Sequence, residues 1–432
     1  MSLSALAPEP SFERRALNRA TFGARAAEEV RVQEVGWPAW VAEQLKPPPG
    51  DEPELAQHIA TRSMHIRYAV QLPAGKSPGW PAVDERRPLN YLRAELPAIW
   101  DMVGKTEISI APNERARIQQ ELNAATWMRN AHARFQLREV MADFWANHFN
   151  VGRQEDIYAA AALVDYDARV IRPRVFGNFR DLLEAVATAP AMLRYLNNAA
   201  SGAERPTENY VRELLELHTL GREPYAGVAA SAGTDTVIAA GFTVAARYTD
   251  QDIAAAARAF SGWTQEHGQD GPGGPLAFTG RFIYNPLQHN DSAGGFMGVD
   301  LAPFNTPRAP PMVQGRVVLD ILADHPATAR FVCAKLARRF FGDAPPPAVL
   351  ARAVAAWTEH RAAPDQLGRV VAALLLGPEV GAPAAKLRRP YEKLIALFRT
   401  THTIVNAYDG ASMALAALGD GLFAWPTPEG RP

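Results

Sequence analysis

The segment Leu137-Arg-Glu-Val-Met-Ala-Asp-Phe-Trp-Ala-Asn-His-Phe-Asn-Val151 carries the pattern that decides the fold class. At about 100° per residue, one helix face collects Leu137, Val140, Met141, Phe144, His148 and Val151. This places His148 on the apolar face, flanked by Trp145. His148 is then either a core histidine satisfied by a backbone carbonyl, or an imidazole aimed at a buried polar centre. The segment alone favours the core histidine.

Helical periodicity extends from this segment in both directions. It covers residues 12–45, most of 89–196, and then 207–220, 249–263, 317–341, 346–360, 366–376 and 390–405. Residues 73–88 and 264–316 are rich in Gly and Pro, so we expect loops there, the second with a short hairpin around Phe278–Tyr284. The sequence therefore predicts an all-α, multi-helical fold, with a single large core or two closely packed lobes.

The bulk composition is that of an ordinary globular protein, with 47% hydrophobic and 21% charged residues. We expect one domain over 1–432, with sub-lobes 1–72, 89–263 and 317–432. Lys and Arg number 45 and Asp and Glu 46, a balance that predicts no nucleic-acid partner. No run approaches the ~20 apolar residues of a membrane span. The first residues lack a secretory signal, which predicts a cytoplasmic protein or an exported one without its leader.

A single cysteine, Cys333, excludes an intrachain disulfide and a cysteine-based zinc cage. Its helical surroundings predict a small packed residue rather than a nucleophile. The chain also lacks the phosphate-binding, dinucleotide, serine-hydrolase and zinc-protease motifs, so no nucleotide or dinucleotide cofactor is expected.

The segment Glu208-Asn-Tyr-Val-Arg-Glu-Leu-Leu-Glu-Leu-His-Thr-Leu-Gly221 has a polar stripe. On an α-helix this stripe contains Asn209, Glu213, Glu216 and Leu220, with Arg212 beside it. The two glutamates could bind a cation or divide acid and base roles; alternatively, they form a solvated face with an Arg212–Glu216 ion pair. His218 projects to the opposite side, so we expect it to be structural, buried and hydrogen-bonded.

Two other segments contain clusters of polar residues, one at a predicted helix start and one in a predicted loop. Thr249 followed by Asp252 is typical of a capping box at a helix start. His289-Asn290-Asp291, in the glycine-rich segment, is a further candidate cluster.

Taken in order, these segments resemble the bacterial family known as domain of unknown function 1800. The resemblance is carried by Leu17-Asn-Arg-Ala-Thr-Phe-Gly23, Phe144–Val151, Glu208–Gly221, Tyr248–Ile253, Phe260-Ser-Gly-Trp263, His325–Phe331, Lys386–Phe398 and Trp425-Pro-Thr-Pro-Glu-Gly430. It implies a helical, often exported protein and supplies no catalytic residue or cofactor. Here the loop at His289 lacks the lysine usual in the family, and the chain stops at Pro432, where relatives commonly continue.

The leading hypothesis is an enzyme whose cleft acts by acid–base or metal-assisted chemistry on a polar substrate such as a glycan. The candidate catalytic residues are His148, Arg212, Glu213 and Glu216; the candidate substrate-binding residues are Asn147, Asn209, Trp145 and His289. A single divalent metal would be held by His148, Glu213 and Glu216, which requires these side chains to lie within about 8 Å of one another. The alternative is a non-catalytic helical binding or scaffold protein, whose polar stripe is a buried structural network.

Overall fold

The computed structural model describes residues 9–105, 108–152, 156–228, 233–271, 273–292, 294–304, 312–383, 386–406 and 419–431. The chain is mostly helical, with 54% helix and 12% strand. The helical prediction is therefore confirmed, whereas "all-α" was wrong because several small two-stranded antiparallel sheets interrupt the helices. In the described residues no helix is both long enough and apolar enough to cross a membrane.

Many helices begin at a proline, whose fixed φ and missing N–H suit the first helical turn. The α-helices are α1 Phe12–Ala20, α2 Ala26–Val35, α3 Trp37–Gln44, α4 Pro53–Ala60, α5 Leu96–Lys105, α6 Pro112–His132, α7 Gln136–His148, α8 Ile157–Ala161, α9 Leu163–Asp165, α10 Phe179–Ala187, α11 Pro190–Tyr195, α12 Glu208–Glu213, α13 Asp250–Ala259, α14 Val313–Asp324, α15 Pro326–Phe341, α16 Pro347–Glu359, α17 Gln366–Leu375 and α18 Pro390–Thr400. Two π-helical segments, η3 Tyr166–Ile171 and η6 Leu214–His218, follow α9 and α12.

The start of α15 corrects one helical prediction. Periodicity alone predicted a continuous helix over 317–341, but α14 ends at Asp324 and α15 begins at Pro326. His325 caps the new helix, because its Nδ1 accepts a hydrogen bond from the amide of Ala327 at 3.1 Å. The predicted capping box at Thr249 is confirmed at the start of α13.

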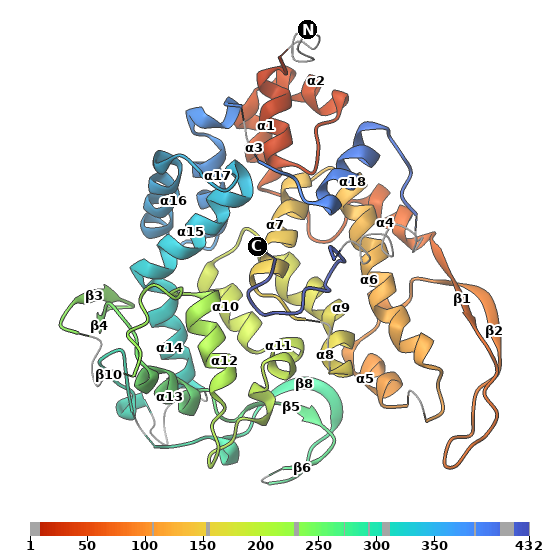
Figure 1. Ribbon diagram of the computed structural model, residues 1–432, viewed down its shortest axis with the longest axis vertical. Helices are drawn as coiled ribbons and strands as arrows, with labels where there is room; N and C mark the ends of the chain where they lie inside the picture. The colour runs from red at the N-terminus through yellow and green to blue at the C-terminus, as the bar shows by residue number, and fades with distance from the viewer. Residues whose placement is uncertain are drawn as a thin grey trace.

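The strands form hairpins at the periphery of the molecule (Figure 1). β1 Ser63–Tyr68 pairs with β2 Val83–Pro88, so the loop predicted for 73–88 was wrong over its last residues. β3 Thr236–Ala239 and β4 Phe242–Ala245 are joined by Ala240 and Gly241, both at positive φ, as a tight two-residue hairpin requires.

The predicted loop at 264–316 contains further strands. The short hairpin expected around Phe278–Tyr284 is instead a single strand, β8 Phe278–Tyr284, which pairs with β5 Trp263–His267. The shorter pairs are β6 Asp270–Gly271 with β7 Gly274–Pro275 and β9 Gly295–Phe296 with β10 Val299–Asp300. Residues 272, 293 and 305–311 of this segment lie outside the described residues.

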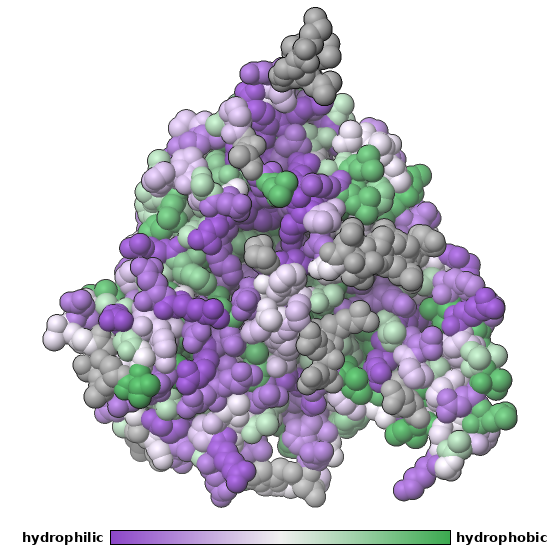
Figure 2. All heavy atoms as spheres, viewed as in Figure 1, coloured by the Kyte–Doolittle hydropathy of each residue, from purple (hydrophilic) through white to green (hydrophobic). Residues whose placement is uncertain are grey.

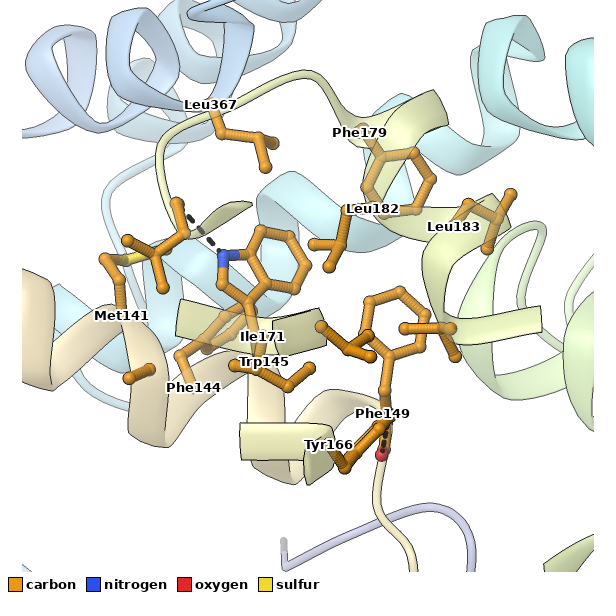
Figure 3. Close-up of a cluster of buried hydrophobic side chains, with 14 of the residues drawn as sticks. Met141, Phe144, Trp145, Phe149, Tyr166, Ile171, Phe179, Leu182, Leu183 and Leu367 are labelled. Atoms are coloured by element: carbon orange, nitrogen blue, oxygen red, sulfur yellow. Dashed lines mark hydrogen bonds between the residues drawn. The ribbon is translucent and has the colours of Figure 1, made fainter. Parts of the chain in front are cut away.

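Helix α7 turns its apolar face into the hydrophobic core, as its periodicity predicted. Trp145 is fully buried and packs against Phe149 and Phe179 (Figure 3). Its indole N–H donates to the carbonyl oxygen of Val175 at 3.1 Å. The buried hydrophobic side chains form one connected cluster, which includes Cys333, confirmed as a packed residue.

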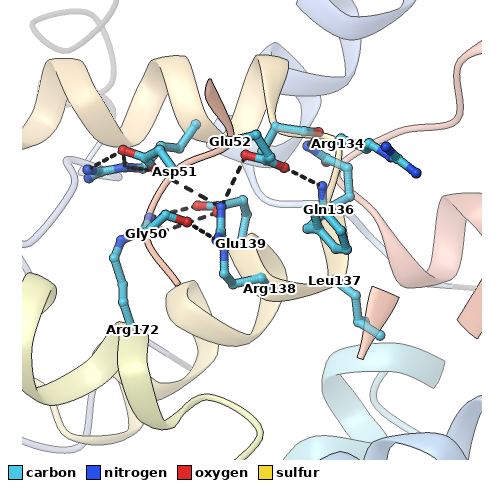
Figure 4. A network of polar contacts seen from close by, with 12 residues as sticks. Gly50, Asp51, Glu52, Arg134, Gln136, Leu137, Arg138, Glu139 and Arg172 are labelled. Carbon is cyan, nitrogen blue, oxygen red and sulfur yellow. Dashed lines mark hydrogen bonds and ion pairs between the residues drawn. The ribbon is translucent and has the colours of Figure 1, made fainter. Parts of the chain in front are cut away.

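A buried ionic network fixes the other side of α7 (Figure 4). The Glu139 carboxylate, with no exposed surface, accepts from Arg138 Nε at 3.0 Å and from an Arg172 guanidinium nitrogen at 2.7 Å. Arg138 also contacts Glu52, and Asp51 lies next to it. Burial raises the pKa of Glu139, but the neighbouring arginines outweigh it and hold this pKa below its usual value. The network ties α7 to the loop before α4.

Candidate functional site

A change of helix type lies at the centre of the polar motif predicted for 207–220. The α-helix α12 ends at Glu213, and the π-helix η6 begins at Leu214. The hydroxyl of Thr219 donates to the Leu214 carbonyl at 2.6 Å, closing the wide turn. A single α-helix was therefore the wrong expectation, and Leu220 lies beyond the helix, buried. Single π turns often occur at functional sites.

Glu213 and Glu216 lie on the accessible side of this turn. An oxygen of Glu216 lies 3.3 Å from Arg222 Nε, and Arg222 in turn lies 3.8 Å from an oxygen of Glu429. Burial, with the neighbouring charge of Glu216, raises the pKa of Glu213 to about 7. Glu429 adds to this shift and Arg222 opposes it. The two motif carboxylates thus have different surroundings, because among the described residues Glu216 is paired with an arginine and Glu213 is not.

Two further groups border this carboxylate cluster. The hydroxyl of Tyr195 donates to the Pro426 carbonyl at 3.1 Å, and burial, together with Glu213 and Glu429, raises its pKa. Burial and the nearby Arg338 lower the pKa of Lys335, on α15, to about 8, although Glu429 opposes the shift. The charge of Glu429, in the C-terminal segment, therefore acts on groups from both α11 and α15.

His148 and His218 lie together on the buried side of η6. Both are fully buried, with ring centroids 6.2 Å apart. His148 Nε2 is 3.1 Å from the His218 carbonyl oxygen, the arrangement expected of a core histidine satisfied by the backbone. Burial and Lys335 lower both pKa values, that of His218 to about 3, so both rings are neutral at physiological pH.

The prediction that His218 is buried and hydrogen-bonded is confirmed only in its first part. It is buried as predicted, but within the described residues neither of its ring nitrogens has a hydrogen-bond partner.

We predicted that His148, Glu213 and Glu216 share one ligand, and this stays a prediction. Among the described residues no group of three or more His, Cys, Asp or Glu side chains is arranged to hold a metal ion.

Asn147 and Asn150 hold the C-terminal segment. The Asn147 amide oxygen accepts from the Arg431 N–H at 2.7 Å, and its amide nitrogen donates to the Arg431 carbonyl at 3.2 Å. Asn150 donates to the carbonyls of Trp425 and Thr427. Beneath this segment, a cavity of about 40 Å³ is lined by Glu139, Arg172 and other polar residues. The amide of Asn147, a candidate substrate ligand, is therefore already used on both sides by the protein.

Arg212 and Asn209, on α12, make local contacts. Arg212 lies 3.1 Å from Glu208 and 3.3 Å from Asp250, and the predicted alternative pair with Glu216 is replaced by Glu216–Arg222. The side-chain amide of Asn209 donates to the Leu196 carbonyl at 3.2 Å.

The last two predicted substrate-binding residues, Trp145 and His289, lie away from the carboxylate cluster. Trp145 is part of the core and donates to Val175. His289 contacts the Ser261 carbonyl at 3.0 Å through Nδ1 and the Gln314 amide oxygen at 2.8 Å through Nε2. It thereby ties its loop to α14 and to the end of α13.

Sequence reasoning missed four residues in or beside the carboxylate cluster, namely Tyr195, Arg222, Lys335 and Glu429. Glu429 was within reach, since it belongs to the Trp425–Gly430 motif, and Arg222 directly follows the Glu208–Gly221 motif. Tyr195 and Lys335 carried no signal, because only folding brings them near Glu429.

Comparison with known proteins identifies the family. The family described as "Protein of unknown function (DUF1800)" matches residues 15–432. No curated protein and no solved structure matches the chain. Because the match extends over nearly the whole sequence and includes both the α7 and the α12–η6 motifs, the chain belongs to the DUF1800 family.

Proposed function

We propose that this protein is an enzyme that uses Glu213 and Glu216 as an acid–base pair on a polar substrate. One observation carries the proposal: the pKa of Glu213 is raised to about 7, whereas the neighbouring Glu216 is ion-paired with Arg222. Two carboxyl groups with divergent surroundings are the usual arrangement for separate acid and base roles. A carboxyl that titrates near neutral pH can both give and take a proton there.

The neighbouring residues support this assignment. Tyr195 adds a hydroxyl beside Glu213, and Arg212 and Asn209 extend the polar surface along α12. Such hydrogen-bonding groups suit a hydroxyl-rich substrate, which is why we favour hydrolysis or elimination on a glycan. In this proposal His148 is a positioning residue, because its bond to the His218 carbonyl holds the end of η6.

The test combines activity with a direct titration of Glu213. The wild type and the variants Glu213→Gln and Glu216→Gln would be incubated with a panel of polysaccharides, and new reducing ends and unsaturated products measured between about pH 5 and pH 8. Removal of a general acid or base is expected to reduce the rate about 10²–10⁴-fold. Glu54→Gln, at an exposed position on α4, is the matched control and should keep full activity.

An infrared difference titration of wild type against Glu213→Gln supplies the independent readout. It should show a carboxyl group that ionises near pH 7. Ionisation of Glu213 in the usual range of an exposed glutamate would overturn the proposal, whatever the activity panel shows.

A non-catalytic scaffold is the second candidate, and Asn147 and Asn150 favour it. These motif residues bind the backbone of the C-terminal segment rather than facing an open cleft. For a scaffold, Glu213→Gln and Glu216→Gln should leave every measured activity and binding property unchanged, while Asn147→Ala alone loosens the C-terminal segment.

A further inference from the structure

An open cavity of about 590 Å³ lies beside the carboxylate cluster, with a volume typical of small-molecule sites. Its walls are the loop after η6, the β3–β4 hairpin and helices α15 and α16. On the face shown in Figure 2, hydrophilic residues extend from the centre of the molecule toward this hairpin.

The cavity has a strong excess of positive charge. Of the residues that the structure describes, four arginines line it, Arg222, Arg247, Arg330 and Arg338, against one acidic residue, Glu223. The whole chain has almost equal numbers of basic and acidic residues, so this excess is local and does not follow from composition. Within the described part of the chain, Arg330 and Arg338 make no ion pair, which leaves both guanidinium groups available to a ligand.

The geometry of α15 concentrates this charge. Arg330, Ala334 and Arg338 are spaced by four residues, so they follow one stripe of the helix along the cavity wall. The first residues of this 16-residue helix, Pro326 and Ala327, also line the cavity, and a helix N-terminus adds partial positive charge. Guanidinium groups bind phosphate-like anions through paired hydrogen bonds.

Apart from His325, the rest of the lining is mostly apolar, including Leu220, Val237, Phe331 and Leu350. An inorganic anion would make no contact with these apolar surfaces. A sugar ring linked to an anionic group would contact both the apolar surfaces and the arginines. Arg222 joins the two sites, since it lines the cavity and also pairs with Glu216.

We propose that this cavity binds the phosphate or sulfate ester group of a sugar-containing ligand. The inference rests on the proposed function in one respect: the anchored ester presents the adjoining bond of the substrate to Glu213 and Glu216. Binding itself needs only the cavity, so it can be measured separately from any reaction.

The experiment is calorimetric titration of the full chain with glucose 6-phosphate, with inorganic phosphate, with inorganic sulfate and with glucose. We expect glucose 6-phosphate to bind saturably and more tightly than either inorganic anion, and glucose not to bind. Binding should weaken at least about tenfold in the double variant Arg330→Gln/Arg338→Gln and should fall with rising salt. Arg369→Gln, an exposed arginine on α17 outside the cavity, is the matched control and should leave binding unchanged.

The outcomes separate the two proposals. Equal binding by wild type and Glu213→Gln supports the cavity independently of the acid–base pair. Tighter binding of either inorganic anion than of glucose 6-phosphate overturns the sugar-binding part of the proposal. No saturable binding, or binding unchanged in a double variant that melts like wild type, overturns the inference.

Discussion

Replacing Glu213 by Gln should stabilise the protein, and more so as the pH rises. The carboxyl has a pKa raised from 4.5 to about 7 in the folded protein, since burial and the charge of Glu216 disfavour its ionised form. Gln keeps the shape of the protonated carboxyl and cannot ionise. The variant therefore avoids the cost that the wild type meets when Glu213 loses its proton.

The sign and size of the effect follow from the two pKa values. Below about pH 4.5 the group is protonated in both the folded and unfolded states and contributes no difference. Between about pH 4.5 and pH 7 the unfolded state ionises first, so the wild type loses stability over this window. The full shift corresponds to at most about 3–4 kcal/mol. Because the carboxylate is partly exposed and screened by solvent, we expect about 1–2 kcal/mol above pH 7.

Urea unfolding of both proteins at about pH 5 and pH 8.5 measures this difference directly. The advantage of Glu213→Gln should be small at the lower pH and reach its full size at the higher one. Glu54→Gln, at an exposed position, should show no pH-dependent difference. A variant that is less stable than wild type at pH 8.5 would refute the reasoning, since it would mean that the ionised carboxylate stabilises the fold.

Two predictions concern the surrounding structure. Glu139→Gln leaves two buried arginines partly uncompensated, so it should lower the free energy of unfolding by about 3–5 kcal/mol. The same change at the exposed Glu359 should have little effect. Thermal melts of the two variants measure both effects. Gly430→Ala should loosen the C-terminal segment in hydrogen exchange, because a Cβ there would overlap the carbonyl of Asn147. Gly419→Ala has the same φ of +72° but open space around it, so equal loosening in both variants would contradict this steric explanation.

The sequence alone determined the features that depend on local interactions. The apolar periodicity of 137–151 correctly placed His148 on the buried face, because an α-helix fixes which residues share a face. The Thr249 cap was predictable for the same reason, since its signal lies within a few residues. The family was also recognisable from these motifs.

Several features could not be predicted because they depend on energies that the local pattern does not contain. The switch from α12 to the π-helix η6 at Leu214 changes the helical phase, and nothing in the apolar spacing indicates where such a switch occurs. The β1–β2 hairpin lies in a stretch whose proline and glycine content is typical of a loop, and its pairing joins residues up to 25 positions apart.

In the candidate site, too, some features follow from the local sequence and others arise only from the tertiary structure. The sequence selected Glu213 and Glu216 by residue type, but their different surroundings arise from Arg222 and from Glu429, more than 200 residues away. Asn147 had the same motif-level signal, yet folding commits its amide to Arg431. The sequence thus determines which polar groups a helix carries. Only the tertiary structure decides which of them are desolvated, paired or left exposed, because those energies come from chain segments that meet after folding.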